Sequence, residues 1–578
     1  MTGKPSIDML YHKNYPKCAA GTKLPEMKLD EYFLEINGKD LDRAGLIFAP
    51  TGQEISIGTM IEEYNNVAKS LTSMGLKPGD NVAVCLLNSP EIVYVLFACS
   101  KIGLTVNMIN PKAPPMSVIK RVKSLHPKVL IAHDKTAPLF NIVKHFIKLP
   151  YIVTTPIVKG ETDIGVKPMD KNVGWWEDFI NIGKHETRIV TVPYDKEQTL
   201  VHTHSSGSTG PTKPIMLGHD TFTHTAHMHL IAGLDYKAGD KWLAAIPALF
   251  STGVNSSVML PILIKLTTIL EPNYDLDVFL KNILRFMPHG ALATKYFWKK
   301  MLEHPDYKNV DLSFLRYGVI AGEKIKQHET RRFDNFLEEH NNTYGIKNGY
   351  GQCELGGGIG NSCLNEKTKG NNTIGFPYTH NVIVIKDLET GEEKGYNERG
   401  EVTAKTTTAM LGYHDMPYET AQYFRNGVAN LGDIGYVNEK GEYYVDCRIS
   451  DKIAVDANIY IFPYEIEDII ERLMESDPVF DKAIIDYAVY GYSIGKYEVP
   501  TLQIYLADEY IKEQDALLIE INSIICKNIG FKNRKIAYKV RTEPLPASVA
   551  GKTDIKPLKR EKKGFFKVGA NQIKPFRL

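Results

Sequence analysis

Residues 55–130 show two alternating periods of apolar and polar positions. Apolar side chains recur at the three- and four-residue spacing of a helix over 61–74, and Gly75 follows as a stop signal. Thr59 and Glu62 have the spacing of a capping box. This stretch therefore predicts an amphipathic helix that starts near Thr59.

Short apolar runs separate the helical segments and predict strands. The runs are Asn81–Leu87, Thr105–Ile109 and Lys128–Ala132. Pro90 opens a second helix and Gly103 closes it. Strands separated by helices imply parallel crossovers, so we predict an α/β fold with a large N-terminal domain of mostly parallel, helix-covered sheets.

The C-terminal part of the chain has a different order of elements. We predict a helix at Pro463–Met474, strands at Lys482–Tyr490 and Val499–Ala507, a helix at Glu513–Ile529 and a strand at Lys535–Arg541. This order is typical of a small α+β domain. We place the boundary near Arg448–Lys452, which gives an N-terminal domain of residues 1–449 and a small C-terminal domain of residues 450–578. The basic tail from Lys559 is expected to be a solvated terminus.

Composition limits the classes of function. A chain of 578 residues is too long for one core. Its formal net charge of +1 creates no global field for nucleic acid, and no apolar stretch is long enough to span a bilayer. Seven cysteines without a Cys-x-x-Cys pair fit a reducing compartment. We expect a cytoplasmic enzyme for small molecules, with no nucleic-acid partner and no membrane span.

A Gly- and Ser-rich loop before Lys213 is the most informative segment. Glycines allow close approach of a ligand, and hydroxyl and amide groups donate to phosphate oxygens. A strand pattern precedes the loop and another follows it, which disfavours a flexible linker. Thr212 and Pro214 flank the lysine, whereas a Walker-type loop needs Gly before it and Ser or Thr after it. The candidate phosphate ligands are Ser205, Ser206, Gly207, Ser208, Thr209, Gly210 and Lys213.

The loop sequence SSGSTGPTK resembles the phosphate-binding signature of the adenylate-forming (AMP-binding) enzymes, which include acyl- and aryl-CoA synthetases. Another family motif, Tyr-Gly-x-Thr-Glu, resembles the run Tyr350, Gly351, Gln352, Cys353 and Glu354. Cys353 replaces the usual threonine. Mg²⁺ accompanies ATP and prefers oxygen ligands, so Glu354 is our candidate metal ligand, with the Thr209 hydroxyl as a second.

Two further motifs imply contacts to the nucleoside. Ala321-Gly322-Glu323 resembles the loop that contacts adenine and bounds the acyl pocket. Asp433, in the sequence GDIG, resembles the family residue that accepts hydrogen bonds from both ribose hydroxyls. Arg448 follows fifteen positions later, as in the family, where that arginine also reaches the ribose.

Near the C-terminus, 545–552 (LPASVAGK) resembles the motif that carries the family's catalytic lysine, here Lys552. A carboxylate that attacks the α-phosphate brings two anions together, and a lysine there stabilises the charge on both. The resemblance also implies that the small C-terminal domain is a mobile lid. This lid domain would rotate between the two half-reactions about a hinge at Ser450–Asp451. CoA-using members usually carry glycine just after the hinge, whereas this chain has none at 452–458.

The resemblance implies an acyl pocket that is formed by Phe250–Gly253, Ala293–Tyr296, Ala321–Glu323 and Gly356–Gly358. Our candidate substrate contacts are Phe250, Gly253, Ala321 and Gly356. No arginine or aspartate stands out as an anchor for an amino-acid substrate. We therefore expect a small-molecule monocarboxylate, aliphatic or aromatic.

The resemblance implies a reaction with ATP, Mg²⁺ and CoA. The enzyme would convert a carboxylic acid to acyl-AMP, release pyrophosphate, and pass the acyl group to the CoA thiol. The missing glycine leaves an alternative in which the acceptor is an acyl carrier protein or another group. A nucleotide-binding pseudoenzyme is the third hypothesis, and it is disfavoured because Lys213, Glu354, Asp433, Arg448 and Lys552 are all present.

The substitution Lys552→Ala should abolish formation of acyl-AMP, because losing a preorganised cation at the reacting phosphate removes about 3–4 kcal/mol of transition-state stabilisation. The fold and the transfer of a pre-formed acyl-adenylate to a thiol should remain largely intact. Single-turnover assays of each half-reaction measure both effects, and equal loss of the two would contradict this role for Lys552.

Overall fold

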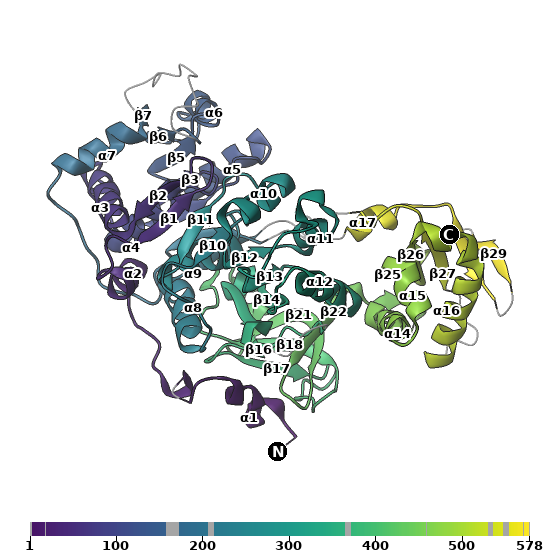
Figure 1. Cartoon of the computed structure of the whole chain (residues 1–578). Helices are drawn as coiled ribbons and strands as arrows, with labels where there is room; N and C mark the ends of the chain where they lie inside the picture. Colours follow the sequence, from purple (N-terminus) through teal and green to yellow (C-terminus); the bar gives the residue numbers. More distant parts are fainter. Residues whose placement is uncertain are drawn as a thin grey trace.

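The structure is a computed structural model, and it describes residues 3–17, 19–157, 173–205, 213–364, 371–457, 459–529, 536–546, 554–569 and 572–576. A large N-terminal domain contains two mostly parallel sheets and one antiparallel sheet. The C-terminal domain forms a separate lobe beside α12 (Gln327–Glu339) (Figure 1). The predicted fold class is confirmed, and the boundary at residue 449 remains a prediction.

The first sheet has nine strands. In spatial order they are β16 (Phe376–Pro377), β15 (Gly357–Asn361), β14 (Ile346–Gln352), β13 (Tyr317–Ala321), β12 (Gly290–Ala293), β10 (Lys241–Ala244), β11 (Thr267–Leu270), β1 (Ala44–Phe48) and β2 (Gln53–Ser56). The strands from β14 to β1 are parallel, and the two edges are antiparallel. One face is covered by α10 (Leu276–Phe286), α11 (Lys295–Glu303) and α12.

The second sheet has eight strands. In spatial order they are β19 (Gly412–Tyr413), β9 (Pro214–Leu217), β8 (Val201–His204), β4 (Thr105–Met108), β3 (Asn81–Cys85), β5 (Val129–His133), β6 (Tyr151–Thr155) and β7 (Val173–Trp175). The strands from β8 to β7 are parallel, as predicted. Its outer face is covered by α5 (Pro115–Leu125) and α6 (Ala137–Val143).

The largest core joins one face of each of these two sheets. Its helices are α2 (Leu29–Asn37), α3 (Ile57–Ser73), α4 (Pro90–Ile102), α7 (Trp176–His185), α8 (His219–Ile231) and α9 (Leu260–Leu263). Helix α4 is apolar on nearly all sides, because it is enclosed by protein rather than lying at the surface. Among the described residues, no helix combines the length and the apolar composition needed to span a bilayer.

An antiparallel third sheet completes the N-terminal domain. It comprises β17 (Val382–Lys386), β18 (Gly400–Lys405), β20 (Phe424–Arg425), β21 (Val428–Val437) and β22 (Tyr443–Arg448). Short elements connect the sheets: α1 (Pro5–Asp8), η1 (Leu10–Asn14), η2 (Ala19–Gly21), the π-helix η3 (Thr252–Met259), η4 (Pro305–Tyr307), η5 (Cys353–Leu355), η6 (Ser362–Leu364) and α13 (Pro417–Tyr423).

The C-terminal domain has the predicted helix and strand order. Its elements are η7 (Ile449–Asp451), β23 (Ile453–Ala454), β24 (Tyr460–Ile461), α14 (Pro463–Ser476), α15 (Pro478–Ala483), β25 (Ile484–Ile494), β26 (Tyr497–Leu506), η8 (Asp508–Glu513), α16 (Gln514–Asn528), β27 (Ala537–Arg541), α17 (Ile555–Leu558), β28 (Phe565–Val568) and β29 (Ile573–Phe576).

Two local predictions were wrong. The tail after Lys559 is not a solvated terminus, because β28 pairs with β27 and β29 pairs with β28. The buried Phe565 side chain contributes to that packing despite the surrounding lysines. The helix predicted to start near Thr59 is α3, and it begins at Ile57. Ser56 is its N-cap residue, because the Ser56 hydroxyl accepts a hydrogen bond from the Thr59 N–H at 3.1 Å.

Basic side chains of the N-terminal domain meet acidic side chains of the C-terminal domain along α11 and α12. Lys326 and Lys299 both contact Asp486 on β25, with Nζ–O distances of 2.9 and 3.0 Å. His328 Nδ1 lies 2.7 Å from Glu471 Oε1 on α14. Further pairs are Lys324–Glu467, Arg331–Asp481 and Arg399–Asp468. Partly buried pairs are screened by salt less than exposed ones, so this interface favours the docked arrangement.

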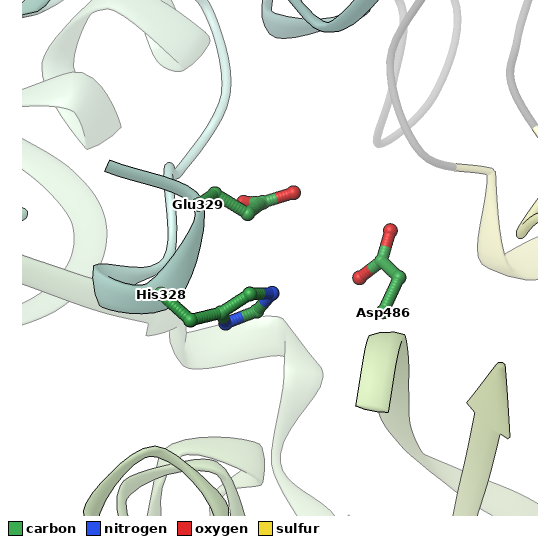
Figure 2. Close-up of side chains that lie close together, drawn as sticks. All are labelled: His328, Glu329 and Asp486. Carbon is green, nitrogen blue, oxygen red and sulfur yellow. The ribbon is translucent and has the colours of Figure 1, made fainter. Parts of the chain in front are cut away.

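His328 and Glu329 of α12 lie opposite Asp486 of β25 (Figure 2), and their ligand atoms lie within 4.8 Å of one another. This spacing would suit a metal ion. However, Lys295 Nζ lies 3.0 Å from Glu329, and two further lysines contact Asp486. The ammonium groups already neutralise the carboxylates and would repel a cation, so we interpret the cluster as an ion-pair network.

Acidification should loosen the docked arrangement. Burial alone would raise the pKa of Glu471, but hydrogen bonds from His328 and Tyr487 lower it to about 2. Because this pKa is below the ordinary value of 4.5, Glu471 stabilises the docked arrangement above about pH 4.5 and loses that contribution as the pH falls toward 2. Small-angle scattering and limited proteolysis between pH 7 and pH 3 should show the domains separating.

The control for this prediction is a matched pair of variants. Glu471→Gln should loosen the domains already at pH 7 and reduce the pH response, whereas Glu475→Gln, at an exposed position of the same helix, should behave as the wild type. Identical behaviour of the two variants would contradict the role given to Glu471.

Candidate active site

A buried carboxylate lies at the centre of the site. The register of β21 and β22 places Asp433 opposite Arg448, and the Arg448 Nε–Asp433 Oδ1 distance is 2.9 Å. Tyr350 donates its hydroxyl to Asp433 Oδ2 at 2.6 Å, and the Gln352 amide donates to the same oxygen at 3.0 Å. Burial raises the pKa of Asp433 above its ordinary value, although these three neighbours oppose the rise. Three residues therefore donate to one buried carboxylate, two of them from the Tyr350–Glu354 motif.

A second cluster of side chains forms around Tyr413, which contacts Lys213 through its ring and Glu354 through its hydroxyl. Tyr413 of β19 donates its hydroxyl to Glu354 Oε1 at 2.8 Å. Lys213 Nζ lies 4.8 Å from the centre of the Tyr413 ring, within the range of a cation–π interaction. The pairing of β19 with β9 positions this ring beside the end of the loop. The sequence analysis did not find Tyr413.

Tyr423 of α13 connects the two groups. Its hydroxyl donates to Gln352 Oε1 at 3.0 Å, and its ring contacts that of Tyr413 edge to face at 6.3 Å. The sequence analysis missed this residue as well. Neither tyrosine belongs to a motif, so only their positions in the fold reveal them.

The phosphate loop begins and ends as a hairpin. Strands β8 and β9 pair antiparallel as far as His204 and Pro214, which confirms the predicted strand on each side. Ser205 Oγ accepts the Lys213 N–H at 2.9 Å, and Ser205 N–H donates to the Lys213 carbonyl at 3.1 Å. The remaining predicted phosphate ligands, residues 206–210, and Lys552 lie outside the described residues and remain predictions.

Glycines allow β14 and β15 to approach each other closely beside the site. A Cβ on Gly351 would lie 1.8 Å from the Gly357 carbonyl oxygen. Gly356 has φ +78°, and its Cβ would lie 2.4 Å from Thr221 Cγ2. The Asn255 amide donates to the Gly356 carbonyl at 2.8 Å and holds this turn against the π-helix η3. Side chains larger than hydrogen cannot fit at these positions.

A largely apolar cavity opens beside the carboxylate site. The void measures about 750 Å³ including its open mouth. It is lined by His229, Tyr236, Trp242, Thr252, Ser256, Leu260, Pro261, Ile264, Leu266, Leu292, Val319, Ala321, Gly322, Gly349, Tyr350, Gly351, Gly357, Gly358, Gly360, Asn361, Cys363 and Tyr378. Tyr350 therefore belongs to both the cavity and the Asp433 group.

The lining of this cavity includes part of the predicted acyl pocket but none of the described residues 293–296. Ala321 lines it directly, as does Gly322 at the end of β13, and Glu323 follows in the same turn. Among the described residues, Phe250, Gly253 and Gly356 are not part of the lining, although Thr252 and Gly357 are. Cys353 begins η5 and packs against the main core. The individual contacts of these residues to a substrate remain predictions.

A sequence model of the AMP-binding enzymes matches residues 35–414, well over half of the chain. The chain belongs to the AMP-binding enzyme family. The predicted class, an AMP-forming ligase related to acyl-CoA synthetases, is thereby confirmed.

The chain is 25% identical over 463 residues to a long-chain-fatty-acid–CoA ligase of Bacillus subtilis, covering 77% of this chain and 80% of that protein. It is 24% identical over 488 residues to a probable 4-coumarate–CoA ligase of Dictyostelium discoideum, covering 82% and 85%.

Solved structures of this fold extend over nearly the whole chain. The anthranilate CoA ligase AuaEII in complex with anthranoyl-AMP matches with a TM-score of 0.75 and 21% identity, covering 94% of this chain and 98% of that one. The amide bond synthetase McbA from Marinactinospora thermotolerans matches with a TM-score of 0.72 and 18% identity, covering 93% and 99%. These similarities confirm the fold.

The substitution Tyr413→Phe should raise the KM for Mg·ATP about tenfold or more. It removes a charge-assisted hydrogen bond to Glu354, an interaction of about 1.5–3 kcal/mol, while retaining the ring beside Lys213. Steady-state kinetics with varied Mg·ATP measure the effect. The control is Tyr396→Phe, which removes a 3.0 Å hydrogen bond to the Asp8 carboxylate elsewhere and should leave KM unchanged. Equal KM values for wild type and Tyr413→Phe would contradict this role.

Proposed function

We propose that this AMP-binding enzyme uses ATP to activate a monocarboxylic acid that has no second charged group as its acyl-AMP, releases pyrophosphate, and transfers the acyl group to CoA. The observation that carries the proposal is the double role of Tyr350. Its hydroxyl binds Asp433, and the same residue lines the apolar cavity. A nucleotide on one side and an acid on the other would meet at this residue.

The motif residues have distinct proposed roles. Asp433, backed by Arg448, would accept hydrogen bonds from the ribose hydroxyls. Lys213 would bind phosphate, and Lys552 would stabilise the charge that develops as the acid attacks. These assignments follow from the resemblance of the motifs, and the clustering of Asp433 and Arg448 at 2.9 Å supports them.

The donor set also fits a magnesium ion. One oxygen of the Glu354 carboxylate accepts the Tyr413 hydroxyl, which orients the carboxylate and leaves the other oxygen for a hard cation. Mg²⁺ bound there would neutralise charge on the ATP phosphates. Thr209 is the second proposed ligand.

CoA is the acceptor that the relatives favour, since the two named above are CoA ligases. The absence of glycine at 452–458 and the exposed Ala457 in that segment keep an acyl carrier protein as the alternative. A structural neighbour that is an amide bond synthetase adds an amine to the acceptors worth testing.

The cavity indicates which acids fit. Its described lining contains no Asp, Glu, Lys or Arg, so an acid with a second charge would lose hydration without gaining a partner. One end lies at Ala321 and Tyr350. Ala321, Val319 and Tyr317 point to the same face of β13, so Tyr317 lies about 13 Å from Ala321 along the strand at 3.3 Å per residue. The Tyr236 ring, which lines the cavity, contacts the Tyr317 ring at a tilted angle with centroids 4.9 Å apart, so Tyr236 marks the end remote from Ala321.

Hydrogen-bonding groups gather at this far end. Burial lowers the pKa of His229 to about 4, so its ring is neutral at pH 7. Its Nδ1 donates to the Thr225 carbonyl at 2.8 Å, which leaves Nε2 as an acceptor. Tyr236 lines the same cavity and carries a hydroxyl group. The Tyr378 ring contacts the His229 ring at a tilted angle, with centroids 4.2 Å apart. Burial raises the pKa of Tyr378, and the nearby Tyr236 raises it further.

A hydroxyl group can donate to the His229 nitrogen and accept from Tyr236 at the same time. We therefore propose that the preferred acid carries a hydroxyl at the end remote from its carboxylate. Sites that hydrogen-bond a substrate hydroxyl strongly reject analogues without it, because their own polar groups are left unpaired.

The test measures AMP, acyl-AMP and acyl-CoA by mass spectrometry after incubation with ATP, Mg²⁺ and matched acids, with and without CoA. The pairs are 3-(4-hydroxyphenyl)propanoate with 3-phenylpropanoate, and 10-hydroxydecanoate with decanoate. We expect kcat/KM at least tenfold higher for the hydroxylated member of one pair. Tyr236→Phe should remove that preference without lowering activity on the other member.

Each failure has a separate meaning. No AMP with any acid would contradict the proposed activation. Acyl-AMP that does not react with CoA would transfer the proposal to another acceptor. Equal kcat/KM values within both pairs, or a Tyr236→Phe variant with the wild-type preference, would refute the hydroxyl at the far end while leaving the activation intact.

A further inference from the structure

An apolar patch is exposed on the outer face of α5, α6 and the turn that follows α6. Met116, Ile142 and Phe146 have 73%, 77% and 81% of their surface exposed. They are the three most exposed large hydrophobic side chains in the described part of the chain. Single exposed apolar residues are ordinary, but three that gather on one face indicate an interaction surface.

The patch is held on a rigid support. Val118 and Val122 of α5 and Phe140 of α6 are buried in the core between these helices and the second sheet. Lys123 of α5 lies over the Phe146 ring at 5.4 Å, which places the turn beside α5. The three apolar side chains therefore lie on α5, α6 and the turn after α6, and the inner faces of both helices are packed against the second sheet.

The segment that carries the patch is rich in cations. Residues 111–150 contain one acidic residue, Asp134, which is buried. The same segment contains the half-buried Arg121, the buried Lys144 and the exposed residues Lys112, Lys120, Lys123, Lys128, Lys135 and Lys148. The whole chain has a formal net charge of only +1, so the positive charge is concentrated here. Phe146 lies in the sequence Lys-His-Phe-Ile-Lys, an aromatic side chain between cations.

The charge and the apolar residues together indicate the partner. In a symmetric contact, a second copy would bring the same lysines face to face, and this repulsion disfavours self-association. The cores of protein interfaces are depleted of lysine. By contrast, aromatic and aliphatic side chains flanked by lysines suit the boundary between lipid headgroups and acyl chains, where anionic lipids attract the cations.

We propose that the outer face of α5 and α6 docks reversibly on an anionic phospholipid bilayer, with Ile142 and Phe146 inserted at the interface. The docking is peripheral. Helices α5 and α6 lie along the upper edge of the N-terminal domain in Figure 1, outside the C-terminal lobe.

The experiment uses the full chain and vesicles of phosphatidylcholine with or without 30% phosphatidylserine, and measures bound protein by co-sedimentation. We expect at least tenfold stronger binding to the anionic vesicles, and loss of most of it at high salt because surface charge is screened. The variant Ile142→Ser with Phe146→Ser should bind at least fivefold more weakly. Lys120→Gln with Lys123→Gln should weaken binding and flatten its salt dependence.

The control is Tyr418→Ser, which removes a side chain of 71% exposure on α13 and should bind vesicles as the wild type does. Thermal unfolding should be unchanged in every variant, because the altered side chains are exposed. No preference for anionic vesicles, or full binding by the Ile142 and Phe146 variant, would overturn the proposal. Concentration-dependent self-association that this variant abolishes would identify a second copy as the partner instead.

Discussion

The Asp433 carboxylate is the constraint on which the candidate site depends. It is almost completely buried, and such a charge is tolerated only when donors surround it. Arg448 from the neighbouring strand and Tyr350 with Gln352 from the large sheet supply those donors. The antiparallel sheet and the nine-stranded sheet are thereby joined at the point where the apolar cavity begins.

Tyrosines extend this network toward the phosphate loop. Tyr423 reaches Gln352, Tyr413 reaches Glu354, and the ring of Tyr413 supports Lys213. Hydroxyl groups suit this task because they can donate to an ionised or amide oxygen while the ring remains packed in apolar surroundings. The network orients the Glu354 carboxylate and the Lys213 ammonium group. The resemblance assigns Glu354 to the Mg²⁺ ion of Mg·ATP and Lys213 to its phosphates.

Although the net charge of the chain is only +1, its charged residues are unevenly distributed over the surface. Cations on α11 and α12 are matched by acids on α14 and β25, which holds the two domains together in this arrangement. The segment that carries α5 and α6, residues 111–150, contains eight basic residues and one acidic residue. The first set explains the predicted response to acid, and the second set carries the proposed attraction to anionic lipid. Neither property follows from overall composition.

The sequence by itself determined the elements and the family, because helix and strand periods, proline and glycine signals and the phosphate loop are local patterns. It also indicated Asp433 and Arg448 as a pair. Only the tertiary structure revealed Tyr413, Tyr423, His229 and Tyr236, because each lies outside any motif and reaches the site through strand pairing or ring contacts. The strands β28 and β29 were missed for the same reason: a strand is stabilised by its partner, and its partner is not local in sequence.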